Sequence, residues 1–211
     1  MTGPTVTGTE PQGEPRIASL TRETGETRVE VELNIDGAGA SEARTGVGFY
    51  DHMLEAFARH GRFDLRVRCE GDLQVDPHHT MEDVALAVGQ AFDTALGDRS
   101  GIVRMGDATV PLDEALVQAV VDLSGRPYAA VGLDFTGERI GEVPTELVTH
   151  VLGSFAVGAR STLHVRQLAG ANDHHVAEAA MKALGRALDA ATRPDGRIVD
   201  QVPSTKGTLT A

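Results

Sequence analysis

The sequence predicts an α+β fold built from two similar halves, each a mixed or antiparallel sheet backed by two helices. Segments of alternating hydrophobicity, typical of half-buried strands, are interleaved with longer segments of helical period. The order of these segments in residues 16–98 returns in residues 99–195, and a histidine pair followed by a glutamate opens the last helix of each half. A half of about 90 residues is small to be stable alone, so we expect the two to pack as one unit.

In the first half, the strict alternation of residues 28–35 predicts a strand, and the apolar spacing of residues 49–63 predicts a helix. Residues 64–69 alternate again and predict a second strand. Cys69 falls on the apolar face of that strand, so we expect a buried, unreactive thiol. A long apolar-periodic helix follows from His78 and ends at Gly97.

The second half repeats this order of strands, helix, strand and helix. Its strands are predicted at residues 109–110, 116–123, 128–135 and 162–166, and its helices begin at residues 144 and 172. Two tails flank the halves. Residues 1–15, rich in Thr, Gly, Pro and Glu, predict a disordered N-terminal tail, and residues 196–211 predict an irregular C-terminal tail.

The composition of the 211 residues narrows the function classes. A net charge of −12 argues against a broad surface for nucleic acid or anionic membrane, and 4% aromatic residues argue against base-stacking platforms. No apolar run approaches the ~20 residues of a membrane helix. One cysteine excludes an internal disulfide framework and a Cys-based zinc site, and the N-terminus lacks a secretory pattern. We therefore expect a soluble cytoplasmic protein. The charge does not exclude a small anionic substrate, which needs only a local cluster of cations.

Six of the eight histidines occupy duplicated positions. The pattern His-His-x-x-Glu occurs twice in matching frame, and each copy follows a further helical histidine at nearly the same offset. Imidazole and carboxylate together are ligands for Mn, Fe, Co or Zn. The duplicated set comprises His52, His78, His79, Glu82, His150, His174, His175 and Glu178.

The spacing of these ligands indicates two metal ions. The first histidine of each pair and its glutamate are i and i+4 on one helix face, whereas adjacent histidines point about 100° apart and suit different ions. Eight ligands over two ions leave positions open on an octahedral metal, which is typical of a catalytic site. One copy of the pattern is better explained by chance, helix capping and the helix dipole than by a metal, but two copies in frame are not. We assign no function to His60 or His164.

A second candidate cluster is cationic. Arg104, Arg126 and Lys206 each lie beside chain-breaking residues, and Ser204 can add a hydroxyl. Arginine offers a planar fork that matches phosphate, and lysine a point charge. Ordinary surface salt bridging is the better explanation of any single arginine. The segment 203–207 is more suggestive, because one of only two lysines lies there in an otherwise uncharged loop.

Several motifs together form a specific set: Arg104 and the segments 48–54, 78–83, 111–116, 122–127, 174–179 and 203–207. This set resembles the imidazoleglycerol-phosphate dehydratase family of histidine biosynthesis, over about residues 16–206. The resemblance implies elimination of water from imidazole glycerol phosphate to give imidazole acetol phosphate. It further implies two Mn²⁺ ions per active site that bind the substrate imidazole or imidazolate between subunits, and a homo-oligomeric 24-mer built from trimers.

The resemblance also assigns roles to residues. It makes the duplicated set the metal ligands, and it gives the phosphate contacts to Arg104, Arg126, Ser204 and Lys206. Glu26 matches a substrate-contacting glutamate of the family. The candidates for proton transfer are Glu26, Asp83 and Glu178, which the sequence does not rank.

Two other functions use the same ligand types. A metallohydrolase would attack a phosphate ester or amide with a metal-bound hydroxide, and it would release inorganic phosphate where a dehydratase retains it. A metal-storage cage would saturate the ions with protein ligands and leave no exchangeable water. The sequence does not fix the metal either, because Zn or Co can occupy such a site.

Overall fold

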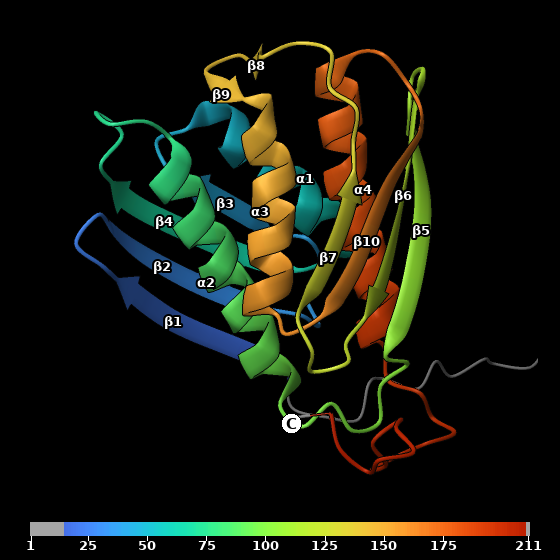
Figure 1. Ribbon diagram of the computed structural model, residues 1–211. Coiled ribbons are helices and arrows are strands. Elements are labelled where there is room, and N and C mark those ends of the chain that lie inside the picture. Colours follow the sequence, from blue (N-terminus) through green and yellow to red (C-terminus); the bar gives the residue numbers. More distant parts are fainter. Residues whose placement is uncertain (1–14, 210–211) are drawn as a thin grey trace, which may run out of the picture.

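The structure, a computed structural model, describes residues 15–209, so the disordered tail expected at 1–15 lies almost entirely outside the described residues. Two four-stranded sheets form the outer layers, and four helices lie between them (Figure 1). The expected duplication is confirmed by the order of the elements and by their pairing. No helix of the described chain is long and apolar enough to cross a membrane.

The two sheets have the same topology. The first has the order β1-β2-β4-β3, and the second the order β5-β6-β10-β7. In each, the first three strands pair antiparallel and the last pair is parallel. The strands are β1 Ile17–Glu23, β2 Thr27–Asn34, β3 Ser41–Arg44, β4 Asp64–Gly71, β5 Met105–Leu112, β6 Ala115–Asp122, β7 Tyr128–Gly132 and β10 Thr162–Ala169.

The helices repeat in the same way. Each half has one helix of 14 residues and one of 19 or 20 residues. The helices are α1 Gly48–Gly61, α2 His78–Leu96, α3 Thr145–Gly158 and α4 Asp173–Thr192. The second half adds a short hairpin of β8 Arg139–Ile140 and β9 Val143–Pro144 directly before α3.

The predictions missed mainly edge strands. β1 and β3 were not predicted, and β5 is longer than the two residues expected. Edge strands bury one face only in part, so their alternation is weak: β3 has no fully buried residue, and β5 contains Gly106 and Pro111. Cys69 is buried as expected, and burial raises the pKa of its thiol to about 11.

Glycines set how closely the helices approach. α2 packs on α3 where a Cβ on Gly89 would lie 2.5 Å from the Phe155 carbonyl oxygen. α4 packs on α1 where a Cβ on Gly185 would lie 2.4 Å from the Phe57 carbonyl oxygen. Any larger side chain would push the helices apart. In both pairs, α2 with α3 and α1 with α4, a glycine therefore allows a helix of the first half to pack closely on a helix of the second.

The fold gathers functional segments at two opposite edges. The starts of α2, α3 and α4 lie at the upper edge in Figure 1, where the Phe49 N–H at the start of α1 donates to Glu142 of the β8–β9 turn. The connections from α2 to β5 and from β6 to β7 lie at the lower edge with the C-terminal segment. The histidine-rich segments and the cationic segments thus lie at opposite edges of the folded chain.

Candidate metal centre and phosphate cluster

Side-chain hydrogen bonds to the backbone hold the helix starts that carry the histidine pairs. Asn172 caps α4, because its side-chain oxygen accepts the backbone N–H groups of His174 and His175 at 3.0 and 3.3 Å. In the first half, the carboxylate of Asp76 accepts the N–H of His78 at 2.7 Å. Both contacts fix the backbone at the residues that carry the paired imidazoles.

The start of α1 is fixed by a different contact. Asp51 accepts hydrogen bonds from the backbone N–H and the hydroxyl of Thr45, at 2.8 and 2.6 Å. The ring of Phe49 packs edge-on against His174, with 5.4 Å between the ring centroids. These contacts bring His52 of α1 close to the start of α4.

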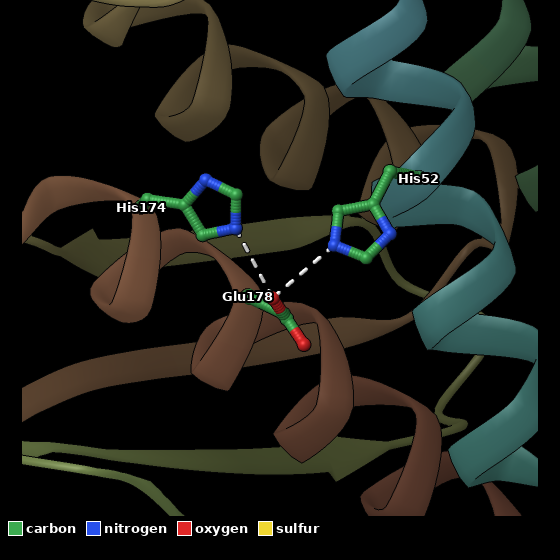
Figure 2. A group of neighbouring side chains, drawn as sticks. All are labelled: His52, His174 and Glu178. Atoms are coloured by element: carbon green, nitrogen blue, oxygen red, sulfur yellow. Dashed lines mark hydrogen bonds and ion pairs between the residues drawn. The ribbon is translucent and has the colours of Figure 1, made fainter.

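The first cluster, the α1–α4 triad, consists of His52, His174 and Glu178. Figure 2 shows both imidazoles turned toward the carboxylate, with each Nε2 atom 3.2 Å from Glu178 Oε2. Glu178 is 14% exposed, and the two histidines face solvent. The triad joins α1 of the first half to α4 of the second.

The second cluster, the α2–α3 triad, consists of His78, Glu82 and His150. His78 Nε2 lies 3.8 Å from Glu82 Oε2, and His150 Nε2 lies 3.3 Å from Glu82 Oε1. The two imidazole centroids are 4.7 Å apart. This triad also combines residues of both halves, so each half supplies ligands to both clusters.

The geometry of both triads fits a metal ion. In each, the ligand atoms all lie within 4.8 Å of one another. Two ligands about 2.1 Å from one ion and at right angles lie about 3 Å apart, close to the separations seen. His150 Nε2 is buried without a hydrogen-bond partner among the described residues. Such a nitrogen is costly unless something else binds it, and a cation does so.

A lysine distinguishes the two triads electrostatically. Lys182 Nζ lies 2.6 Å from Glu178 Oε1, one helical turn along α4. Burial opposes ionisation of Glu178, but Lys182 and His52 outweigh it and lower the pKa of that carboxyl to about 2. Glu178 is therefore a carboxylate throughout the neutral range, ready to bind a cation.

The second histidine of each pair lies outside the triads. His79 Nδ1 is 3.0 Å from Asp72 Oδ2, and His175 Nδ1 is 2.8 Å from Glu114 Oε2. These carboxylates raise the pKa of both imidazoles. A carboxylate on Nδ1 fixes the ring and leaves Nε2 as the atom available for a metal.

Glu114 is itself firmly held. Its carboxylate also accepts the backbone N–H of Asn172, at 2.9 Å, at the start of α4. His175 and this N–H together lower the pKa of Glu114 to about 2. Neither Glu114 nor Asp72 was given a role by the sequence analysis. Glu114 lies inside one of the quoted motifs, whereas nothing in the sequence marks Asp72.

The three candidates for proton transfer have different surroundings. Glu26 is 54% exposed, with Oε1 3.7 Å from His79 Nε2. Asp83 is buried instead: it lies 2.6 Å from Arg22 and accepts the hydroxyl of Thr27. Asp83 thus lies on the side of α2 that packs against β1 and β2, and its role in proton transfer stays a prediction.

The cationic residues meet around an open depression of about 540 Å³, lined by Arg104, Arg126 and residues 203–206. Arg104 is already engaged. Its Nε and Nη2 donate to Asp122 at 2.7 and 2.9 Å, and its Nη1 donates to the Pro203 carbonyl at 2.7 Å. Arg126 and Lys206 are exposed, and neither has an ion-pair partner within residues 15–209. They are the free cations of this cluster.

Comparisons with known proteins show the family to which this chain belongs. Residues 45–188 match the family described as imidazoleglycerol-phosphate dehydratase. Proteins of that name from Roseiflexus sp. (strain RS-1) and Gluconacetobacter diazotrophicus are 57% and 54% identical, over 92% of this chain and 98% of each relative.

Two solved structures with this description are also similar. The one from Pyrococcus furiosus is 37% identical with a TM-score of 0.78, and the alignment covers 90% of this chain and all of the other. The one from Staphylococcus aureus is 34% identical with a TM-score of 0.77, over 85% of this chain and 99% of the other. The shared fold extends over nearly the whole described chain.

Proposed function

Because the chain belongs to the imidazoleglycerol-phosphate dehydratase family, we propose that its two triads and its phosphate cluster are parts of that family's active site. The chain is a hydro-lyase of histidine biosynthesis, and it eliminates water from imidazole glycerol phosphate to give imidazole acetol phosphate. One observation carries the assignment of residues. Two copies of one ligand pattern converge across the halves into two triads of matching composition.

We assign two Mn²⁺ ions to each active site, with the eight residues of the duplicated set as their ligands. Two observations support this assignment: His150 Nε2 is buried with no hydrogen-bond partner among the described residues, and the low pKa of Glu178 keeps its carboxylate ionised at neutral pH. When bound, such ions supply Lewis-acid chemistry that holds the substrate imidazole and favours its ionised form.

The proposed site needs more than one copy of the chain. Each triad offers three ligands from one chain, while His79 and His175 belong to neither triad and have a carboxylate on Nδ1, which leaves Nε2 for a metal. The phosphate cluster lies at the opposite edge from both triads. We propose that His79 and His175 complete the ion sites of neighbouring copies, and that the cluster binds the phosphate of a substrate held there. This supports a homo-oligomer; the 24-mer built from trimers and the cytoplasmic location stay predictions.

The phosphate cluster would anchor the substrate away from its reacting atoms. Arg126 and Lys206 have charges that no described acidic residue neutralises, and Ser204 lies in the same depression. Arg104 faces the depression too, while Asp122 and Pro203 hold it in place. Binding energy gained at the phosphate can then orient the imidazole ring at the metal edge.

Of the three acidic candidates, Glu26 suits proton transfer best. The proton to be lost is on a carbon without an adjacent carbonyl, so a well-placed base is needed. Glu178 is a weak base because its pKa is about 2 and both its oxygens are engaged. Asp83 is enclosed by Arg22 and Thr27. Glu26 is exposed and stands beside His79, whose Nε2 we assign to an ion.

Metal analysis combined with turnover tests this proposal. The purified protein is assayed with imidazole glycerol phosphate before and after chelation, and again after Mn²⁺ is restored. We expect two ions per chain, loss of turnover on chelation, recovery with Mn²⁺, and a product that retains phosphate. Full turnover by the metal-free protein would refute the metal assignment, and release of inorganic phosphate would favour the metallohydrolase.

A further inference from the structure

An arginine at the lower edge is completely buried. Arg99 follows the C-terminus of α2, is 0% exposed and has a φ of 61°. A non-glycine residue in this left-handed region is uncommon and strained. A buried guanidinium is also costly unless its charge and its N–H groups are satisfied. The structure must therefore hold Arg99 by specific contacts.

Those contacts tie three segments of the chain together. Arg99 Nη2 lies 2.5 Å from Asp93 Oδ1 of α2 and donates to the carbonyl of Ala159, at the C-terminus of α3, at 3.3 Å. Arg99 Nη1 donates to the carbonyl of Leu209 at 3.2 Å, across 110 positions of sequence. The carbonyl at a helix C-terminus carries partial negative charge and, with Asp93, compensates the charge of the guanidinium, whereas Arg99 Nε has no hydrogen-bond partner among the described residues.

The partner in the C-terminal segment is an apolar anchor. Leu209 is 3% exposed, whereas residues 205–208 just before it are exposed. The phosphate loop, defined as residues 203–206, is thus held on both sides. Upstream, Arg104 binds the Pro203 carbonyl; downstream, Arg99 binds the Leu209 carbonyl.

We infer that Arg99 and Leu209 form a clasp that positions the phosphate loop for substrate. The hydrogen bonds within the loop are short-range, such as Lys206 N–H to Ser204 Oγ at 3.1 Å, and they shape it without fixing it to the body of the protein. A lysine on a flexible stem binds phosphate well only where its backbone is fixed. Arg99 and Leu209 touch no substrate, so they are positioning residues, and their role rests on the proposed function of the loop.

The clasp is tested with Leu209→Ala, which removes the apolar anchor and leaves Arg99 with Asp93. Leu209→Met is the conservative rescue, and Val199→Ala, at an exposed position of the same segment, is the matched control. We expect Leu209→Ala to raise KM for imidazole glycerol phosphate about tenfold with a smaller change in kcat. Leu209→Met and Val199→Ala should keep the wild-type KM, and all three variants should keep the wild-type Mn²⁺ content.

Hydrogen exchange of the loop amides provides a second, independent readout. In Leu209→Ala and in Arg99→Lys, residues 203–206 should exchange at least about tenfold faster, while α2 and α3 keep their protection. Unchanged KM and unchanged exchange in a folded Leu209→Ala protein would overturn the clasp, whether or not Arg99→Lys folds. Faster exchange with unchanged KM, both here and in Lys206→Ala, would keep the clasp as an anchor but refute the phosphate role of the loop.

Discussion

The two triads use the same ligand types at equivalent places on duplicated helices, yet their surroundings differ. In the α1–α4 triad, Glu178 is 14% exposed and is bound by Lys182 one turn away. In the α2–α3 triad, Glu82 is 35% exposed, and Leu86 stands one turn away. Duplication thus kept the ligands and changed the electrostatics around them. We expect the two ion sites to differ in affinity.

The carboxylates that contact the second histidine of each pair, Asp72 and Glu114, differ in their position along the chain. Asp72 follows β4, whereas Glu114 lies in the turn between β5 and β6. These positions are not equivalent in the two halves, yet each carboxylate binds Nδ1 of the second histidine of its pair. The contact is thus the same in both halves although the residue that makes it is not, which indicates that the orientation of these imidazoles matters.

The largest effect is expected from breaking either triad. His52→Ala removes a ligand from the α1–α4 triad alone, and His150→Ala removes one from the α2–α3 triad alone. Each should lower kcat by at least a factor of about 100, because in the proposed site both ions bind one substrate ring. Each should also lose about one Mn²⁺ per chain by elemental analysis. If one variant kept wild-type turnover, the triads would not act together.

A smaller effect, on stability, is expected where the duplicated helices diverge. Asp83 of α2 is buried against Arg22, whereas the equivalent position of α4 is Ala179. Asp83→Asn leaves Arg22 without its partner and should lower the free energy of unfolding by about 2–3 kcal/mol. Chemical denaturation measures this loss, with Ala179→Ser as a comparison in the other half. Turnover of folded Asp83→Asn should stay near the wild-type value; a collapse of kcat would favour Asp83 over Glu26 as the group that transfers the proton.

The next prediction compares the two triads at one edge of the molecule with the phosphate cluster at the other. Lys206→Ala should raise KM for imidazole glycerol phosphate about tenfold, because one uncompensated cation is lost from the phosphate cluster. Its Mn²⁺ content should match the wild type, since the triads lie at the other edge. Steady-state kinetics and elemental analysis on one preparation measure KM and Mn²⁺ content together. Loss of metal in Lys206→Ala would contradict the separation of the phosphate cluster from the triads.

The smallest effect concerns the asymmetry itself. Lys182→Met makes the surroundings of Glu178 resemble those of Glu82. The folded pKa of Glu178 is depressed from 4.5 to about 2, so the stabilisation is present above pH 4.5 and is lost as the pH falls toward 2. In the metal-free protein, the variant should be less stable by about 1 kcal/mol at neutral pH.

Urea midpoints measured at neutral pH and near pH 3 test this, with exposed Arg186→Met on the same helix as the control. A difference between wild type and Lys182→Met that stays constant across that range would show that Lys182 acts through packing rather than through Glu178.

The helices were predictable because periodicity and the histidine pairs mark their starts, and α2 and α4 begin within about a residue of the predicted positions. The ligand types were predictable for the same reason. The pairing of His52 with Glu178 and of His150 with Glu82 was not, since it depends on which helices cross at the glycines. The burial of Asp83 is likewise a tertiary property, because only its contact with β1 and β2 distinguishes it from a surface acid.

The central claim is that two cross-half triads each hold a divalent ion. Anomalous diffraction at the X-ray absorption edge of manganese, from crystals grown with Mn²⁺, tests it most directly. We expect two peaks per chain, one touching His52, His174 and Glu178 and one touching His78, Glu82 and His150, each with a further imidazole from another copy. A single peak, or peaks away from both triads, would contradict it.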